Sequence, residues 1–109
     1  MSVELPVLPD LRLELSAPNV EAPVALASLL ADRVRSGILA LLRDGPHCVC
    51  EMAAALDERQ NNVSNHLARL RDAGLVRTTR LGGDARRMYY ERDEAACAAA
   101  ADDLERLLR

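Results

Sequence analysis

Hydrophobic residues recur every three or four positions along most of this sequence, the spacing that places them on one face of an α-helix. The clearest case lies between residues 59 and 77, where Val63, Leu67 and Leu70 form a single stripe before Gly74 ends the helix. Similar stripes predict four further helices, over 23–30, from an N-cap at Asp32 to about 43, over 48–56 and over 93–108.

The pattern changes after Gly74. Residues 75–81 and 86–91 are short β-prone runs, and the glycine-rich segment 82–85 between them predicts a hairpin turn. Residues 1–20 hold three of the five prolines and alternating leucines, which predicts a short strand or an extended arm rather than a helix. We therefore expect an arm over 1–20 and one domain over 21–109, mainly α with a small β-hairpin.

Polar side chains surround the stripe of the 59–77 segment. Asn and Gln can bond adenine edges at two points, Arg does the same for guanine, and Ser suits phosphates. A tight turn at 57–59 joins this helix to the one before it, which is the helix-turn-helix arrangement. We interpret the segment as a DNA recognition helix, although a solvated polar face would look similar. The candidate contacts are Gln60, Asn61, Asn62, Ser64, Asn65, His66 and Arg69.

The distribution of charge supports this interpretation, although the net charge of −3 at first disfavours a nucleic-acid partner. Residues 59–92 hold eight arginines against three acidic residues, so a basic segment lies between acidic flanks. The arginines of the predicted hairpin would make it a wing that touches the phosphate backbone of double-stranded DNA. The wing candidates are Arg80, Arg86 and Arg87.

The amino-acid composition excludes several other classes of protein. Aromatic residues make up 2% of the chain, and no apolar run approaches the roughly 20 residues of a membrane span. The acidic Glu4 near the start argues against a secretion signal, so we expect a cytoplasmic protein with free thiols. No catalytic triad or glycine-rich phosphate loop is evident, which disfavours an enzyme. The apolar stripe of the 93–108 helix predicts a homodimer built with the first helix.

Two sequence runs carry a family resemblance. The run 63–76, VSNHLARLRDAGLV, and the run 48–51, CVCE, together resemble the ArsR/SmtB family of winged-helix metal-sensing repressors. The resemblance covers about residues 25–108 and implies a winged helix-turn-helix with four helices, two strands and a last helix. It implies DNA contacts by 60–66 and by a wing at 80–88. It also implies a dimer that leaves its operator when an inducer binds.

The 48–51 run is similar to the Cys-Val-Cys-Asp box of the family's arsenic, antimony, cadmium and lead sensors. Thiolates favour soft ions, so Cys48 and Cys50 are the candidate ligands for As(III) or Sb(III), and otherwise for Cd(II), Pb(II) or Zn(II). Residues two apart lie about 200° apart on a helix, so chelation requires an unwound or distorted helix start. Both thiols are expected to be partly exposed beside Val49 of the core stripe.

The sequence offers two candidates for a third metal ligand. The family's arsenite sensors often have a cysteine three positions after the box, where this chain has Ala53, and residues 1–47 hold no cysteine. Cys97 and His47 are the candidates, and a packing role for Cys97 is favoured by its place in an apolar stripe. Two other functions stay open: a thiol redox switch on the same DNA-binding fold, and a protein-interaction module without DNA binding.

Overall fold

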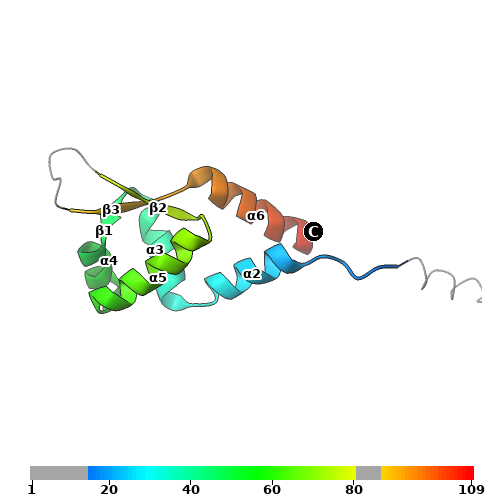
Figure 1. Ribbon diagram of the computed structural model, residues 1–109, viewed down its shortest axis with the longest axis horizontal. Coiled ribbons are helices and arrows are strands. Elements are labelled where there is room, and N and C mark those ends of the chain that lie inside the picture. The colour runs from blue at the N-terminus through cyan, green and yellow to red at the C-terminus, as the bar shows by residue number, and fades with distance from the viewer. Residues whose placement is uncertain (1–14, 81–86) are drawn as a thin grey trace, which may run out of the picture.

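A computed structural model describes residues 15–80 and 87–109 of the chain. Figure 1 shows α3, α4 and α5 gathered at one end, while α2 and α6 lie beside each other at the other. No helix in these two ranges is long and apolar enough to cross a membrane. The elements in chain order are α2 (Glu21–Leu30), α3 (Arg33–Leu42), β1 (His47–Cys48), α4 (Val49–Leu56), α5 (Gln60–Asp72), β2 (Val76–Thr79), β3 (Tyr89–Arg92) and α6 (Glu94–Leu108).

The predicted mainly helical winged helix-turn-helix is confirmed, and its helix ends follow from local chemistry. Asp32 caps α3, because its carboxylate accepts the backbone N–H groups of Val34 at 2.9 Å and Arg35 at 3.0 Å. Asp57 adopts the left-handed conformation, with φ of 54°, in the turn between α4 and α5. Gly74 follows α5 with φ of 83°, a conformation that glycine adopts without strain.

The sheet has three strands in the order β1-β3-β2, all antiparallel. The predicted hairpin is the β2–β3 pair, in which Val76 lies opposite Arg92 and Thr79 opposite Tyr89. Strand β1 was not predicted. It is two residues long, too short for an alternating pattern to be visible, and its partner β3 lies some 40 residues further along the chain.

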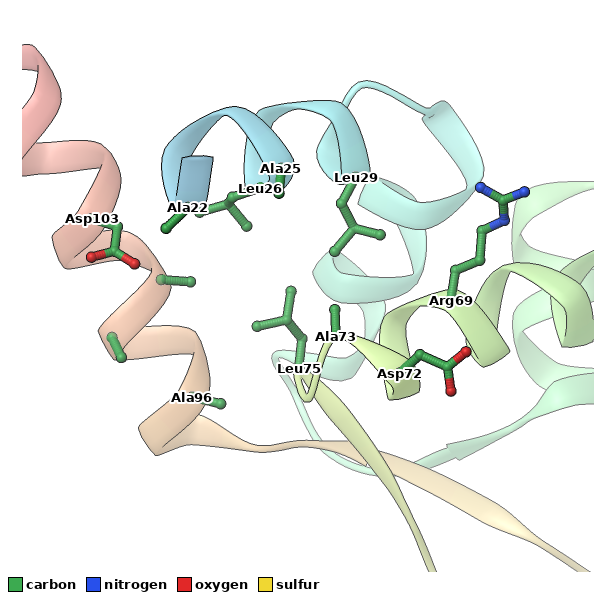
Figure 2. Close-up of a pocket in the computed structure, with 12 residues that line it drawn as sticks. Ala22, Ala25, Leu26, Leu29, Arg69, Asp72, Ala73, Leu75, Ala96 and Asp103 are labelled. Atoms are coloured by element: carbon green, nitrogen blue, oxygen red, sulfur yellow. The ribbon is translucent and has the colours of Figure 1, made fainter. Parts of the chain in front are cut away.

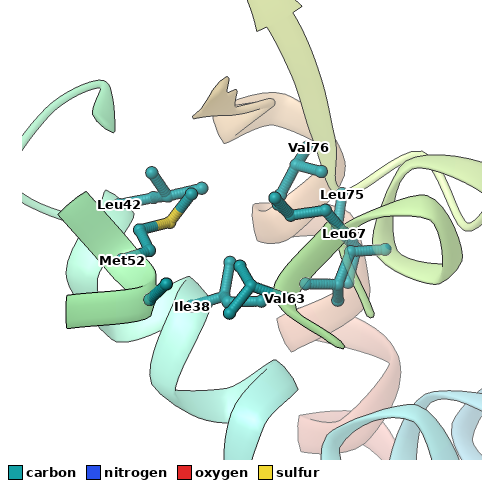
Figure 3. Close-up of a cluster of buried hydrophobic side chains, with 9 residues drawn as sticks. Ile38, Leu42, Met52, Val63, Leu67, Leu75 and Val76 are labelled. Carbon is teal, nitrogen blue, oxygen red and sulfur yellow. The ribbon is translucent and has the colours of Figure 1, made fainter. Parts of the chain in front are cut away.

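A single hydrophobic core joins the helices to the sheet (Figure 3). The stripe of α5 lies at its centre, since Val63, Leu67 and Leu70 have no exposed surface. Tyr90 packs against this core from β3. Burial of this stripe determines which side of α5 is exposed to solvent. The other core residues are Ile38, Leu42, Met52, Ala53, Leu75 and Val76.

Some sequence predictions concern residues outside the described ranges. These are the arm over 1–14, the hairpin turn at 82–85 and the wing residue Arg86. Residues 15–20 form neither helix nor strand, and the Leu15 side chain is exposed.

Candidate DNA-contact face and thiol pair

Five of the predicted DNA contacts on α5 are exposed, namely Arg69 and four residues with amide or hydroxyl side chains. Gln60, Asn61, Ser64 and Asn65 all lie on the surface of the helix, away from its buried stripe. Asn61 and Asn65 are four residues apart, so their amides project from one side of the helix, one turn from each other. This face offers amide and hydroxyl groups, which suit base edges and phosphate oxygens.

Two other predicted contacts are engaged within the protein. The Asn62 amide donates to the carboxylate of Glu58 at 2.8 Å. The His66 side chain is 19% exposed, and its Nδ1 lies 3.0 Å from Nη1 of Arg35. Their contact with DNA stays a prediction, but each already has an intramolecular partner.

The arginines of α5 and the hairpin also differ in their surroundings within the protein. Arg69 lies on the side of α5 that faces α2, where it lines a groove (Figure 2). Arg80 and Arg87 are exposed, and both also interact within the protein. Arg77 bonds Glu91 across the hairpin at 2.8 Å and lies 3.4 Å from Asp93, so the positive charge of the strands is partly balanced. Arg80 and Arg87 are therefore the described wing arginines that stay closest to their predicted role.

The first of the paired cysteines is not where the sequence predicted. Cys48 is 3% exposed, whereas partial exposure was expected. It forms the end of β1 in extended conformation and pairs with Tyr89 of β3, while α4 begins only at Val49. The sequence predicts a helix from about residue 48, with Val49 in its core stripe. Pairing with a distant strand outweighs the local preference for helix at this position, and Cys48 is buried.

The second cysteine occupies a different environment. Cys50 lies in the first turn of α4 and is exposed. Burial raises the pKa of the Cys48 thiol, and a hydrogen bond with the Cys50 thiol raises it further. The two thiols differ in exposure although a single residue separates them in the chain. The unwound helix start that chelation requires exists at Cys48 without any distortion.

Glu51 holds the start of α4. Its carboxylate accepts the backbone N–H of Cys48 at 3.0 Å, which forms a capping box with the cysteine as N-cap. This hydrogen bond is the main cause that lowers the pKa of Glu51. His47 Nδ1 lies 3.4 Å from the same carboxylate. The imidazole proposed as a third ligand is thus already paired with Glu51.

The other candidate ligand, Cys97, belongs to another part of the fold. Its thiol donates to the carbonyl of Leu75 at 3.6 Å, and burial raises its pKa. Leu75 comes directly before Val76, which lies opposite Arg92 of β3. Cys48 lies opposite Tyr89 of the same strand. These positions on β3 are three residues apart, roughly 10 Å along a strand. Within residues 15–80 and 87–109, no group of three His, Cys, Asp or Glu side chains is placed to hold a metal ion.

Arg35 is a polar residue of interest that the sequence reasoning missed. It is 9% exposed, and its guanidinium reaches the α2 carbonyls of Leu29 at 2.6 Å and Ser28 at 3.4 Å. A signal existed, because Arg35 lies on the same helical stripe as Ile38 and Leu42. A charged residue on an apolar stripe needs buried partners.

A groove of about 620 Å³ separates α2 from α6 and the end of α5 (Figure 2). Alanine and leucine side chains form most of its walls. Neither α2 nor α6 has a buried residue, although both are rich in apolar residues. The groove residues are Ala22, Ala25, Leu26, Leu29, Arg69, Asp72, Ala73, Leu75, Ala96, Ala99, Ala100 and Asp103.

The known proteins that are similar to this chain are transcription regulators. The sequence model of the arsR family of bacterial regulatory proteins matches residues 32–78. The arsenical resistance operon repressor of Escherichia coli K12 is 47% identical over 55 residues, 50% of this chain and 47% of that protein. The transcriptional activator HlyU of Vibrio cholerae is 33% identical over 89 residues, 82% of this chain and 80% of that protein. The chain spans about half the length of the arsenic-resistance relatives it matches.

A solved structure extends the comparison to the fold. The homodimeric winged helix-turn-helix DNA-binding domain from Mycobacterium bovis, a possible ArsR-family regulator, has a TM-score of 0.61 and 29% sequence identity to this chain. The match covers 75% of this chain and 74% of the domain.

Proposed function

Since the chain belongs to the ArsR family of bacterial transcription regulators, which are not enzymes, we propose that it is a homodimeric repressor. It binds operator DNA through α5 and the β2–β3 wing, with residues 1–20 as an arm. It releases the operator when As(III) or Sb(III) binds Cys48 and Cys50. The observation that carries the proposal is the thiol pair itself, located at the junction of the wing sheet and the helix-turn-helix.

Support for DNA binding comes from the exposed face of α5. The amides of Asn61 and Asn65 project from the solvent-exposed side of α5. Arg80 and Arg87 are the last and first described residues on either side of the hairpin turn. An α-helix fits the major groove of B-DNA, where side-chain amides can bond adenine edges. The hairpin arginines suit phosphate contacts on either side.

Support for a homodimer comes from α2 and α6. Both helices expose apolar side chains, among them Val24 at 56%, Leu107 at 51% and Leu108 at 80%. The groove between them is lined mainly by small apolar residues, which permit close packing of a second pair of helices. The similar Mycobacterium bovis domain is homodimeric, and a two-fold dimer would present two copies of α5 to two half-sites.

Support for a thiophilic inducer comes from the chemistry of the cysteine pair. Thiolates prefer soft ions, and the two cysteines lie on either side of Val49 at the junction of β1 and α4. Capture of arsenite forms two As–S bonds, and each bond releases one water molecule made from an arsenic hydroxyl and a thiol proton. The third oxygen can stay on arsenic, so two protein sulfurs suffice. The relative in Escherichia coli is named for arsenical resistance.

The proposed release follows from the burial of Cys48. To share an ion with exposed Cys50, the Cys48 sulfur must turn outward or the ion must reach the buried sulfur. The Cys48 side chain takes part in the capping box of α4, so moving its sulfur would disturb this cap beside the β1–β3 pair. The wing continues from β3, and α4 packs on α5, so both DNA-contacting elements would shift.

The DNA-binding part is tested with the reduced full-length protein and its own promoter DNA, by electrophoretic mobility shift at several salt concentrations. We expect binding that weakens steeply with salt and is lost in an Asn61→Ala/Asn65→Ala variant. Circular dichroism of that variant should match the wild type. Absence of salt-dependent binding would favour the protein-interaction module instead.

A redox switch on the same fold is the second candidate, favoured by two free cysteines that are separated by a single residue. Hydrogen peroxide would take two electrons and two protons from Cys48 and Cys50 and leave a disulfide. Mass spectrometry after peroxide and after arsenite separates the two functions, because a disulfide lowers the mass by two hydrogens whereas a metalloid adduct raises it. The same measurement with Cd(II), Pb(II) and Zn(II) tests the remaining inducers, for which His47 is the nearby nitrogen donor.

A further inference from the structure

Arg35 connects three elements of the fold through one buried guanidinium. Its Nε and Nη2 donate to the carbonyls of Leu29 and Ser28, which belong to the last turn of α2. The last carbonyls of a helix have no partner within it, so Arg35 caps α2 from α3. Its Nη1 lies 3.0 Å from Nδ1 of His66, on α5. One side chain therefore joins the proposed dimerisation helix to the recognition helix.

The protonation state of His66 follows from this geometry. An arginine side chain has only donors, so His66 Nδ1 must accept, and the neutral imidazole carries its proton on Nε2. Protonation of Nδ1 would convert the acceptor into a donor that faces a guanidinium. The Arg35–His66 hydrogen bond cannot survive that change.

Asp32 supplies the alternative partner. Its Oδ1 lies 3.8 Å from His66 Nδ1, and its Oδ2 lies 3.9 Å from Arg35 Nη1. A protonated imidazole would turn from Arg35 to this carboxylate. Among the other charged groups on the elements packed against α5, Glu51 of α4 bonds Cys48 and lies near His47, and Arg77 of β2 pairs with Glu91 and Asp93. Arg33 of α3 is exposed.

We propose that Arg35 and His66 are positioning residues that lock α5 in its DNA-binding orientation, and that protonation of His66 opens this lock by transferring the imidazole from Arg35 to Asp32. The inference rests on the proposed DNA binding but not on the thiol pair. It gives His66 a role different from direct phosphate contact. The two roles predict opposite effects of acid, because a protonated histidine at a phosphate would strengthen binding.

The test is operator affinity of the full-length reduced protein, measured by fluorescence anisotropy between pH 8 and pH 5.8 at constant ionic strength. We expect affinity to fall on acidification by at least about fivefold, the lower end of usual coupling between sites. His66→Asn, whose Oδ1 can occupy the position of Nδ1 and accept from Arg35, should lose the pH dependence. His47→Gln is the matched control, since it removes the other histidine and should retain the dependence.

Two further measurements separate positioning from simple stability. Arg35→Gln should weaken operator binding at pH 8 and remove the pH dependence, while thermal unfolding at each pH monitors the folded fraction. Nitrogen NMR of the His66 ring at pH 8 should find Nδ1 unprotonated. A protonated Nδ1 at that pH, a flat pH profile in the wild type, or affinity that rises on acidification would each overturn the lock. Failure to bind DNA at any pH would instead reject the proposed function.

Discussion

Cys48 lies opposite Tyr89 in the antiparallel pair of β1 and β3, so one thiol of the pair belongs to the sheet that forms the wing. The other thiol, Cys50, lies on α4, which packs on the recognition helix α5. An ion held by both sulfurs would therefore connect the two DNA-contacting elements of the fold. This arrangement lets a small change at the thiols reach α5 and the wing at once.

The difference in exposure between the thiols predicts different reactivity. Cys50 is exposed, whereas Cys48 is buried and its pKa is raised by that burial. Iodoacetamide should alkylate Cys50 at least about tenfold faster than Cys48, because the raised pKa of Cys48 and its burial both slow the reaction there. Peptide mass mapping over time measures both rates, with Cys97 as an internal comparison. Equal rates at 48 and 50 would contradict the burial of Cys48.

Ion binding should loosen the connection between β1 and β3. We expect As(III) to speed hydrogen exchange at the amides of 47–48 and 89–90, because the Cys48 thiol must leave its buried position. Hydrogen-exchange mass spectrometry of the protein with and without As(III) measures this. Cys50→Ser is the control, since it keeps β1 but removes one sulfur. A change confined to α4 would show that the wing is not coupled to the thiols.

The two kinds of DNA contact should respond differently to mutation. Asn61→Ala should cost about 1–3 kcal/mol of operator binding and relax sequence preference, because it removes a candidate base contact. Arg80→Ala should weaken binding to all sequences alike and reduce the salt slope by about 1, because it removes a candidate phosphate contact. Anisotropy with operator and scrambled DNA at several salt concentrations distinguishes them. Identical profiles for the two variants would contradict the assignment.

The helices and the hairpin could be predicted because their signals are local. The stripe of Val63, Leu67 and Leu70 and the capping residue Asp32 act within a few residues of themselves. Strand β1 and the burial of Cys48 could not be predicted, since both depend on pairing with Tyr89 far along the chain. His66, the partner of Arg35 on α5, was missed for the same reason.

In the candidate site, too, local features could be predicted and contacts between distant residues could not. Exposure of the amides on α5 followed from helical periodicity, because a buried stripe on one side leaves the opposite side open. The engagement of His66 did not, because its partner Arg35 is 31 positions away in the sequence. Residue types predicted the chemistry of the site, and tertiary contacts decided which groups are available for it.

Acid should destabilise the fold partly through Asp32. The pKa of this carboxylate is lowered, mainly by the hydrogen bond from the Arg35 backbone N–H. A lowered pKa in the folded state contributes stability above the normal pKa, and that contribution is lost as the pH falls through the folded value. The free energy of unfolding should therefore decline from about pH 5 to pH 3.

Asp32→Asn tests this contribution, because asparagine keeps a capping oxygen without the charge. Urea unfolding at each pH should give a shallower decline in the variant than in the wild type. Part of the decline should remain, since the pKa of Glu51 is also lowered. A decline of equal steepness in both proteins would exclude Asp32 as a contributor.

The central claim is that thiol binding of a soft ion controls DNA binding, and one titration tests it most directly. As(III) is added under reducing conditions to the wild type, Cys48→Ser, Cys50→Ser and Cys97→Ser on labelled promoter DNA, and anisotropy is recorded. We predict release from the wild type and Cys97→Ser, and retained binding in the two box variants. Operator binding by the wild type that As(III) leaves unchanged would contradict the claim.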